Sequence, residues 1–557
     1  MTRPMKALPL GEVDEHAESF MVAMRDGVRL ATDVYLPTGA RGPIPAVLVR
    51  LPYDKSSRFA FMAQVAERFC ARGFAFVAQD VRGKAHSEGE LEGFVHEVDD
   101  GADTLEWVAT RHWCDGAVGM FGDSYYGFTQ WAAAASGHPA LRGIVPRMTS
   151  TQIGEDWMWR QGVFNLFQIA EWAATTWIDH RAYEGVPDFG VRPLDDAIPA
   201  VQEGRRSADF DRWRRRGPRD RFWTEHIWGP GARMPDRIRI PVLHTGGWWD
   251  VFNRSQVADY ARLIGLGVPD QFLVMGATDH FDDELRPDGD VVADFEEDPE
   301  ALTAFLPGYL GPALDFFDRV LRGRETSIPS VRWNLASEGW REASSWPPPK
   351  VRELVLHAVG AASALRGAEG GGLLPEPDRS AGEVAWTHDP EHLVPDGIAD
   401  PWRSLYPALP DERSVQERDD VLTFTSEASD VPLDLAGTLA VEATCRSTGP
   451  TMHLAAKVTD VFPNGRVRRV AQGIAVVADP SAPRRVRVDL GPTGYRLRPG
   501  HRLRLDLAGS MFPRSLWDPG TGEDPWRAVR GRAQRHDVTI GGAEGVELSM
   551  HVLPTEP

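Results

Sequence analysis

A glycine-rich stretch near residue 120 carries the first side chain that could do chemistry. It reads Gly122-x-Ser124-x-x-Gly127. A serine acts as a nucleophile when it stands on a sharp strand-to-helix turn, because small neighbours let the backbone fold closely and free helix N–H groups can stabilise an oxyanion. The usual pattern is G-x-S-x-G, but here Tyr126 takes the second place after Ser124. The stretch predicts a nucleophile turn, with an ordinary glycine-rich turn as the alternative.

A serine nucleophile of this type needs an acid and a histidine, in the chain order Ser, Asp or Glu, His. Asp250 and His280 follow Ser124 in that order, each just beyond an apolar run that predicts a strand. Open α/β sheets place their sites at such strand ends, so we predict that these two residues serve Ser124. Asp279 adjoins His280 and is badly placed to hold its ring, and His244 lies inside a predicted strand. Three other histidines precede the acid and break the order: His138, His180 and His226.

The oxyanion of such a reaction needs two hydrogen-bond donors. The backbone N–H of Tyr125 is one candidate. An HGGG run often presents the second donor, but the loop at residues 51–55 carries Tyr53 instead. A neutral phenol donates well, so we predict the Tyr53 hydroxyl as the second donor. A half-buried core tyrosine is the alternative.

The elements that must position these residues alternate between strand and helix patterns. A hairpin around the turn Asp26-Gly27 opens the chain, and the alternation that follows predicts a mainly parallel α/β sheet. The predicted strands are 45–50, 74–80, 118–121, 240–245 and 271–276, and the predicted helices are 61–72, 99–110, 128–135 and 312–321.

The pattern changes twice along the chain. Residues 149–238 are crowded with aromatic side chains and charged helical runs, which predicts a helical cap inserted into the α/β domain. That domain would comprise residues 1–148 and 239–324. Short alternating apolar segments separated by turn residues then predict an all-β sandwich or jelly roll over residues 325–557.

Several aromatic side chains are candidates for the substrate pocket, since aromatic walls are common in ligand sites. Most aromatics of the insertion are expected to fill its own core. The predicted substrate contacts are Tyr126, Trp157, Trp172, Trp249 and Phe252.

The composition argues against several classes of protein, among them nucleic-acid-binding, membrane-spanning and disulfide-rich proteins. A net charge of −20, with 42% hydrophobic and 25% charged residues, argues against nucleic acid and anionic membranes as partners. The three cysteines, Cys70, Cys114 and Cys445, are too far apart in sequence for a metal cluster or a disulfide framework. The first twelve residues lack an apolar secretory segment, and no apolar run is long enough to span a membrane. We therefore expect a cytoplasmic enzyme without metal or cofactor that acts on a small molecule. The oligomeric state stays open, a homodimer included.

Further motifs accompany the candidate residues along nearly the whole chain. They are Pro52-Tyr53-Asp54-Lys55, Asp80-x-Arg82-Gly83, Ser87-Glu88-Gly89, Trp113-Cys114-Asp115-Gly116, Gly247-Trp248-x-Asp250, Val458-Thr459-Asp460-Val461-Phe462-Pro463-Asn464-Gly465 and Pro499-Gly500-His501-Arg502. As a set they resemble the CocE/NonD hydrolases, a family that includes esterases, α-amino-acid ester hydrolases and Xaa-Pro dipeptidyl-peptidases.

The resemblance implies an α/β-hydrolase fold with an inserted helical cap, followed by a C-terminal all-β jelly-roll domain. It also implies hydrolysis of an ester or amide by a serine triad, with Tyr53 as an oxyanion donor. Two departures affect the substrate rather than the fold: Tyr126 in the nucleophile turn, and Gly276-Ala277-Thr278-Asp279-His280 in place of a Pro-Trp-x-His run.

Two other functions compete with an esterase. Hydrolysis of amino-acid esters or Xaa-Pro peptides would need carboxylates for a substrate ammonium; Glu155 and Asp156 are candidates, although an exposed pair at a helix start is the commoner explanation. A binding protein built on the all-β domain, with an inactive hydrolase domain, is disfavoured by the intact set of Ser124, Asp250 and His280.

Overall fold

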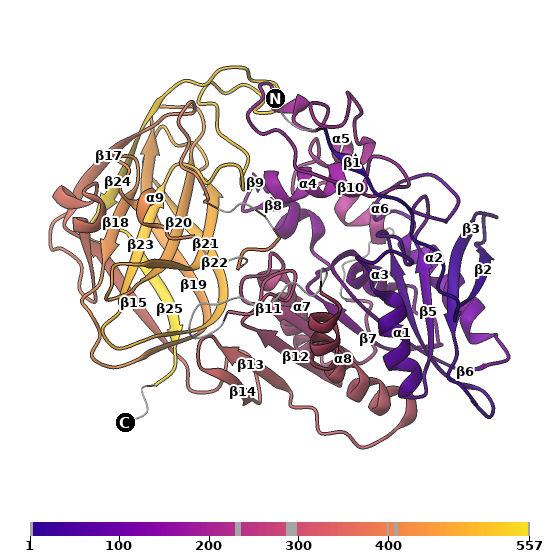
Figure 1. Ribbon diagram of the computed structural model, residues 1–557. Coiled ribbons are helices and arrows are strands. Elements are labelled where there is room, and N and C mark those ends of the chain that lie inside the picture. Colours follow the sequence, from indigo (N-terminus) through magenta and orange to yellow (C-terminus); the bar gives the residue numbers. More distant parts are fainter. Residues whose placement is uncertain are drawn as a thin grey trace.

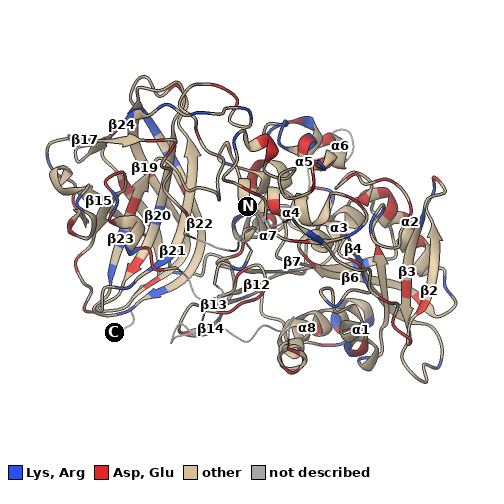
Figure 2. Ribbon diagram, turned by 45° about the horizontal axis from the view of Figure 1, so that its top comes forward, with Lys and Arg blue, Asp and Glu red and all other residues tan. Residues whose placement is uncertain are grey.

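The computed structural model describes residues 4–228, 236–285, 298–397, 400, 402–405 and 410–554. A ten-stranded sheet with helices on both faces forms one half of the molecule, and an all-β domain forms the other (Figure 1). A segment inserted between β7 and β11 lies between the two halves at one end. Basic and acidic residues are interspersed along both halves (Figure 2). Among the described helices, none has the length and apolar character needed to cross a membrane.

The ten-stranded sheet has the order β14-β13-β12-β11-β7-β6-β4-β5-β3-β2. Its seven strands from β13 to β5 run parallel, and the edges add antiparallel partners. The strands are β2 (Glu18–Ala23), β3 (Arg29–Tyr35), β4 (Ile44–Leu51), β5 (Ala75–Asp80), β6 (Cys114–Asp123), β7 (Leu141–Arg147), β11 (Val242–Gly247), β12 (Gln271–Gly276), β13 (Val331–Leu335) and β14 (Gly339–Ala343). The predicted hairpin and the five predicted parallel strands are all present.

Successive residues of the central strands point to opposite faces, and both faces are apolar, as in sheets covered on two sides. In β4, Val47 and Val49 pack with α1 (Met62–Ala71) and α8 (Pro299–Arg322). The alternate residues Ala46 and Leu48 join the core on the opposite face. Three helices cover that face: α2 (Glu97–Ala109), α3 (Ser124–Ala135) and α7 (Asn253–Gly265).

Helix α8 is longer than predicted. It begins at Pro299, where the Asp298 carboxylate accepts a hydrogen bond from the Glu300 N–H, and ends at Gly323 in the left-handed conformation. The predicted helix covered only residues 312–321. Pro312 instead lies inside the helix.

The inserted segment is less helical than predicted. It contains the π-helix η1 (Ile153–Met158), β8 (Trp159–Arg160), β9 (Val163–Phe164), α4 (Leu166–Thr176), β10 (Tyr183–Glu184), η2 (Leu194–Asp196), α5 (Ala208–Trp213), η3 (Arg221–Trp223) and α6 (Glu225–Trp228). Residues 229–235 of the predicted cap lie outside the described residues. Strand β10 pairs with β1 (Lys6–Ala7), which ties the N-terminal segment to the insertion.

Aromatic side chains form the core of the insertion and join it to α3. The Trp172 and Trp213 rings are stacked 5.2 Å apart, and Trp177 lies 5.3 Å from the Tyr125 ring of α3. The insertion therefore packs beside the helix that Ser124 begins, and most of its tryptophans have a structural role, as expected.

The C-terminal domain joins eleven strands in a mostly antiparallel arrangement. They are β15 (Arg352–Val359), β16 (Gly371–Leu374), β17 (Gly382–His388), β18 (Leu422–Thr425), β19 (Leu433–Ser447), β20 (His453–Val461), β21 (Val467–Val476), β22 (Arg484–Leu497), β23 (Arg502–Ala508), β24 (Gln534–Ile540) and β25 (Glu547–Val552), with η4 (Ala361–Ser363), η5 (Gly367–Glu369) and α9 (Arg413–Gln416) between them.

The first alternating segment after the predicted boundary, residues 331–335, was expected to belong to the all-β domain and instead forms a strand of the central sheet. β13 pairs in parallel with β12, and β14 returns beside it, so residues 331–343 extend the central sheet. The predicted boundary at residue 325 therefore does not coincide with the change of sheet. An alternating run carries no information about its partner strand, which is why the sequence pattern could not assign β13.

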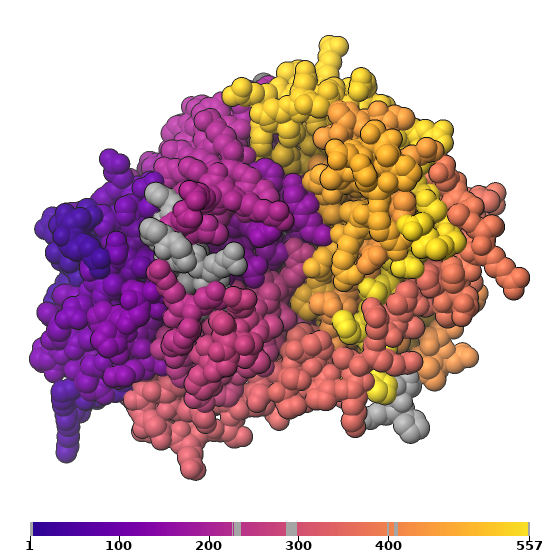
Figure 3. Space-filling view, turned by 180° about the vertical axis from the view of Figure 1, so that it is seen from behind, coloured from indigo at the N-terminus to yellow at the C-terminus, as the bar shows by residue number. Residues whose placement is uncertain are grey.

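The two halves are joined through aromatic and backbone contacts. Trp248 of the sheet domain stacks on Trp346, which precedes β15, with ring centroids 4.9 Å apart. The Ala336 N–H donates to the Gly494 carbonyl of β22 at 2.9 Å. In the space-filling view the C-terminal domain, orange to yellow, abuts the rest of the chain along a broad face (Figure 3).

Gly122→Ala should destabilise the fold at the end of β6. Gly122 has φ 143°, and a Cβ there would overlap the Tyr126 ring. The backbone strain costs about 1–3 kcal/mol and the overlap adds about 1–3 kcal/mol. Gly116→Ala, in the same strand, is the matched control, because φ is 89° and no atom lies within 4 Å of its Cβ. Urea unfolding should show the larger loss for Gly122→Ala; equal losses would contradict the packing argument.

Candidate active site

Ser124 occupies a strained turn between β6 and α3. It is the first residue of α3 and has φ 53°, a left-handed conformation that non-glycine residues rarely adopt. The spacing of the glycines also has a physical cause. Tyr126 packs over Gly122, and a Cβ on Gly127 would lie 2.5 Å from Thr149 Cγ2. The second glycine is thus required where α3 passes closely over the chain after β7.

Asp250 and His280 form a close pair. Asp250 follows β11 and His280 follows β12, and these parallel neighbours end at the same edge of the sheet as β6. His280 Nδ1 lies 2.5 Å from Asp250 Oδ2, and the other carboxylate oxygen accepts the Phe252 N–H at 2.8 Å. Both side chains are buried. The carboxylate therefore favours the tautomer with the proton on Nδ1, which leaves Nε2 able to take a proton.

A buried arginine ties the serine turn to the histidine loop. Arg147 ends β7; its Nε lies 2.9 Å from Asp123 Oδ1 and its Nη2 lies 2.7 Å from Asp282 Oδ2. Asp123 precedes Ser124, and Asp282 follows His280 by two residues. The Tyr309 hydroxyl of α8 donates to Asp123 at 2.8 Å, and the guanidinium lies over the Tyr309 ring. Sequence reasoning missed this bridge, whose members lie far apart in the chain.

Tyr53 lies close enough to Ser124 for the serine side chain to influence the pKa of the phenol. The Trp172 indole N–H of the insertion donates to the same hydroxyl at 3.1 Å. Burial raises the pKa of Tyr53 to about 12, so the phenol is neutral and keeps its proton for donation near pH 7. The loop is fixed by buried charges, since the Lys55 N–H donates to Asp80 Oδ1 and Lys55 Nζ lies 3.0 Å from Asp33 Oδ2.

The Tyr125 side chain points away from the reacting atoms. Its hydroxyl donates to Glu97 Oε1 at 2.9 Å and accepts the Phe94 N–H at 2.9 Å. Its backbone N–H lies in the first turn of α3, where N–H groups have no acceptor within the helix. Any contribution of Tyr125 to an oxyanion site must therefore come from its backbone.

Three of the five predicted substrate contacts form a continuous aromatic wall. The Phe252 ring lies 5.8 Å from the His280 ring and 5.0 Å from Trp157, and Trp157 lies 5.2 Å from Trp172. Trp172 then reaches Tyr53. This wall connects the histidine with the predicted oxyanion donor.

The other two predicted contacts lie elsewhere. Tyr126 packs edge-on against Tyr53, within the core between the sheet and α8. Trp249 points to the C-terminal domain, where its ring lies 6.3 Å from Tyr495 and its indole N–H approaches the Arg469 carbonyl at 3.5 Å. These positions make both of them framework residues around the site.

The rival residues have structural partners. Asp279 is buried and accepts the N–H groups of Phe281, Asp283 and Leu405, which anchors the histidine loop to the C-terminal domain. His244 is buried in β11, and burial lowers its pKa to about 3. The two carboxylates of the insertion that were considered for a substrate ammonium also have partners in the chain. Asp156 pairs with Arg254, and Glu155 is exposed near Arg219. The alternative explanation of an exposed helix-start pair therefore holds only for Glu155.

Two residues beside the site were missed by sequence reasoning. Trp402, from the C-terminal domain, covers the His280 ring with centroids 4.8 Å apart. Its indole N–H donates to Glu171 Oε2 of α4 at 2.6 Å. Burial raises the pKa of Glu171 to about 8. Neither residue lies in a periodic or motif-like context, so no signal in the sequence could have found them.

Comparisons with known proteins show the family of the chain. Residues 26–282 match the model of the X-Pro dipeptidyl-peptidase (S15) family, and residues 324–543 match the X-Pro dipeptidyl-peptidase C-terminal non-catalytic domain. The chain is 30% identical to a cocaine esterase from Rhodococcus sp. (strain MB1 Bresler), over 91% of this chain and 92% of that protein. The chain belongs to the S15 and CocE/NonD family of serine hydrolases.

Two solved structures share the fold over nearly the whole chain. An aminopeptidase from a marine sediment archaeon, Thaumarchaeota archaeon, has a TM-score of 0.80 at 21% identity and covers 98% of this chain and 99% of its own. An α-amino acid ester hydrolase has a TM-score of 0.79 at 23% identity and covers 98% of both chains. The arrangement of sheet domain, insertion and C-terminal domain is therefore a family arrangement.

Glu171→Gln should gain stability over the wild type as the pH rises. The raised pKa keeps Glu171 protonated in the folded protein up to about pH 8, whereas in the unfolded chain it ionises near pH 4.5. Between about pH 4.5 and pH 8 the free energy of unfolding of the wild type therefore falls relative to that of the glutamine variant. Above about pH 8 the difference between the two no longer changes. Thermal unfolding midpoints from pH 4 to 9 measure this. Glu155→Gln, at an exposed glutamate of the same insertion, is the matched control. A difference for Glu171→Gln that does not change with pH would contradict the prediction.

Proposed function

We propose that this enzyme hydrolyses carboxylic esters through an acyl-enzyme on Ser124, with His280 as general base and acid and Asp250 holding the imidazole. The observation that carries the proposal is the 2.5 Å contact between Asp250 and His280 at the sheet edge where the strained Ser124 turn also ends. We also assign the sheet domain to the α/β-hydrolase fold, the insertion to its cap and the C-terminal domain to a jelly roll. The strand ends that carry serine, acid and histidine support this assignment.

The reaction follows from these roles. Ser124 Oγ attacks the substrate carbonyl carbon while His280 Nε2 takes the hydroxyl proton, and the Asp250 carboxylate stabilises the imidazolium that forms. The tetrahedral intermediate expels the alcohol, which receives the proton from Nε2. A water molecule then attacks the acyl group, giving its proton to Nε2, and the carboxylic acid leaves as Ser124 recovers its hydroxyl.

The oxyanion of the intermediate would be held by the Tyr53 hydroxyl and the Tyr125 backbone N–H. The closeness of Tyr53 to Ser124 and the fixed loop behind Tyr53 support this role. Donors that are already placed cost no reorganisation when the charge forms. Trp172, which donates to the Tyr53 oxygen, leaves the phenolic proton free to point at the oxyanion.

The aromatic wall favours an ester with an apolar or aromatic acyl group over an α-amino acyl substrate. Asp156, the buried cap carboxylate proposed for an ammonium group, is paired with Arg254. The cocaine esterase relative supports ester hydrolysis as well. Cleavage of Xaa-Pro peptides or amino-acid esters by the same triad is the second candidate, because the matched family model is that of X-Pro dipeptidyl-peptidases. Hydrolysis rates on pairs of esters that differ only in an α-amino group distinguish the two candidate functions.

Ser124→Ala should abolish both ester turnover and labelling by a fluorophosphonate probe, which reacts with activated serine hydroxyls. Ser136→Ala is the control, since Ser136 caps the other end of α3 and its hydroxyl donates to the Ala133 carbonyl. It should retain labelling. Mass spectrometry of the labelled peptide identifies the modified residue, and a label on any residue other than Ser124 would refute the assignment.

Tyr53→Phe should fold normally and lose roughly 100- to 1000-fold in the rate of acylation, the usual cost of removing one oxyanion donor. Tyr125→Phe removes a buried phenol that bonds Glu97 and leaves the backbone N–H in place, so it should lose much less. Pre-steady-state kinetics on an ester whose acylation limits the rate measures both. If Tyr53→Phe acylates at nearly the wild-type rate, Tyr53 only packs in the core and does not act as an oxyanion donor.

A further inference from the structure

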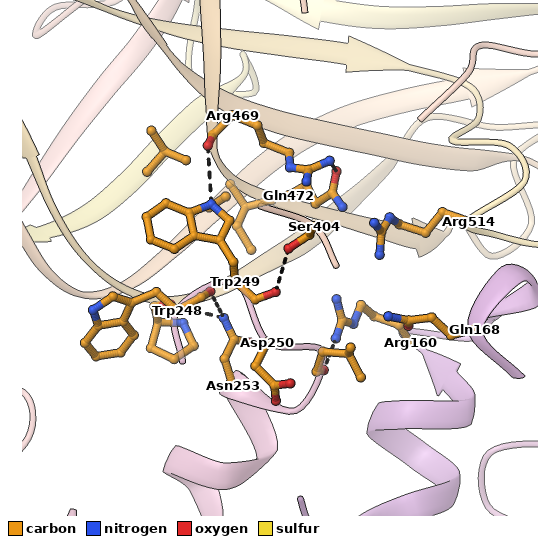
Figure 4. Close-up of a pocket in the computed structure, with 15 residues that line it drawn as sticks. Arg160, Gln168, Trp248, Trp249, Asp250, Asn253, Ser404, Arg469, Gln472 and Arg514 are labelled. Atoms are coloured by element: carbon orange, nitrogen blue, oxygen red, sulfur yellow. Dashed lines mark hydrogen bonds between the residues drawn. The ribbon is translucent and has the colours of Figure 1, made fainter. Parts of the chain in front are cut away.

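A small cavity lies behind the loop that carries Asp250, where three parts of the chain meet. It has a volume of about 60 Å³, and a water molecule needs roughly 10–15 Å³ on the same measure. Its walls come from the loop after β11, from β8 and α4 of the insertion, and from the C-terminal domain (Figure 4). The cavity is large enough for one small polyatomic ion or a few water molecules.

Three arginines dominate the walls. Figure 4 shows the guanidinium groups of Arg160, Arg469 and Arg514 around one space, reaching it from the insertion and the C-terminal domain. Asp250 is the only acidic residue among those that line the cavity in the described chain, and its two oxygens already bind His280 and the Phe252 N–H. The cavity walls therefore carry an excess of positive charge.

Two of the arginines have one acidic partner in common. Arg514 Nε lies 2.6 Å from Asp396 Oδ2, and Arg469 lies 3.6 Å from the other oxygen of the same carboxylate. The Arg469 side chain is 3% exposed and Arg514 is 14% exposed. Glu412 also lies 4.0 Å from Arg469. The two arginines therefore share Asp396, and their guanidinium groups face the cavity (Figure 4).

Arg160 is the cation with the fewest partners. Its Nη2 donates to the Val251 carbonyl at 2.9 Å, and no carboxylate of the described residues lies within 4 Å of it. The nearby acids Asp156 and Asp489 are both paired with Arg254. Burial, together with Arg254 and Arg514, lowers the pKa of Arg160 to about 10. Burying a cation without a counter-charge is costly, so an anion beside Arg160 would be stabilising.

We propose that this cavity binds a small oxyanion, a phosphate or a carboxylate, between Arg160, Arg469 and Arg514. Arginine presents a planar fork of N–H donors that matches both groups. Asp156 and Asp489 attract Arg160 from beyond contact distance, and the oxyanion would supply an anion in direct contact with it. Because Arg160 holds the Val251 carbonyl, next to Asp250, the bound ion would also stiffen the loop that positions His280. The inference does not depend on which ester the enzyme cleaves.

Thermal unfolding with inorganic phosphate, acetate and chloride at constant ionic strength tests the site. Phosphate or acetate should raise the midpoint in a saturable way that chloride does not match. If phosphate raises the unfolding midpoint at a lower concentration than acetate, the natural ligand is a free inorganic ion. If acetate raises it at the lower concentration, the natural ligand is a carboxylate such as a hydrolysis product. No saturable shift with either oxyanion would overturn the proposal.

Arg160→Met should raise at least tenfold the oxyanion concentration that gives half of the maximal shift in the unfolding midpoint. Arg219→Met, which removes an exposed arginine of the same insertion, should respond like the wild type; equal responses of the two variants would overturn the proposal. If Arg160→Met does not fold, Arg160→Gln replaces it, and crystals of the wild type soaked in selenate provide a direct measurement. Anomalous density between the three guanidinium groups supports the site, and density confined to other places contradicts it.

Discussion

The buried ion bridge at Arg147 is the interaction on which the arrangement of the active site depends. One guanidinium binds Asp123 at the end of β6 and Asp282 in the loop after β12, although β7 and β11 separate these strands in the sheet. Those carboxylates lie one and two residues from Ser124 and His280. Such a bridge adds little to net stability, because burying the charges costs much of what their attraction returns. Its effect is on geometry, since the two loops can move only together while the bridge is intact.

The remaining parts of the chain close the site from three directions. Helix α8 contributes Tyr309, which holds the far oxygen of Asp123. The insertion contributes Trp172 to the Tyr53 hydroxyl, and the C-terminal domain contributes Trp402, which lies over His280 and bonds Glu171. Each contact removes water from a charged or polar group of the reaction. In the proposed mechanism, a lower local dielectric would strengthen the Asp250–His280 pair and the oxyanion donors alike. The all-β domain would then take part in the chemistry although it carries no member of the proposed triad.

The sequence predicted the elements whose signal is local. Buried strands such as β4 and β12 are continuous apolar runs, and Ser124, Asp250 and His280 follow from chain order at strand ends. The parts that escaped prediction depend on contacts between distant segments. Arg147 looks like any strand-end arginine, β13 has a pattern that suits either sheet, and Trp402 lies in a loop without periodicity. Trp249 was selected as an aromatic residue beside Asp250, but the turn after β11 directs its side chain to the C-terminal domain. Composition identifies aromatic residues, and only the fold decides which of them face the substrate.

The buried charged residues fall into two groups, those with a counter-charge in the chain that hold the structure together and those whose pKa burial shifts toward the neutral form. Arg50 is fully buried against Glu97, Lys55 lies between Asp33 and Asp80, and Arg254 lies between Asp156 and Asp489. In each case the counter-charge belongs to the chain, and the group holds a loop or a domain contact. Glu171 and Arg160 differ, because burial shifts the pKa of each toward its neutral form. Both lie beside the Asp250–His280 pair, where insertion and C-terminal domain meet. A protein with a net charge of −20 has many acids with which to neutralise an arginine. An arginine at this place that contacts no carboxylate of the described residues is therefore the feature that most requires a ligand to explain it.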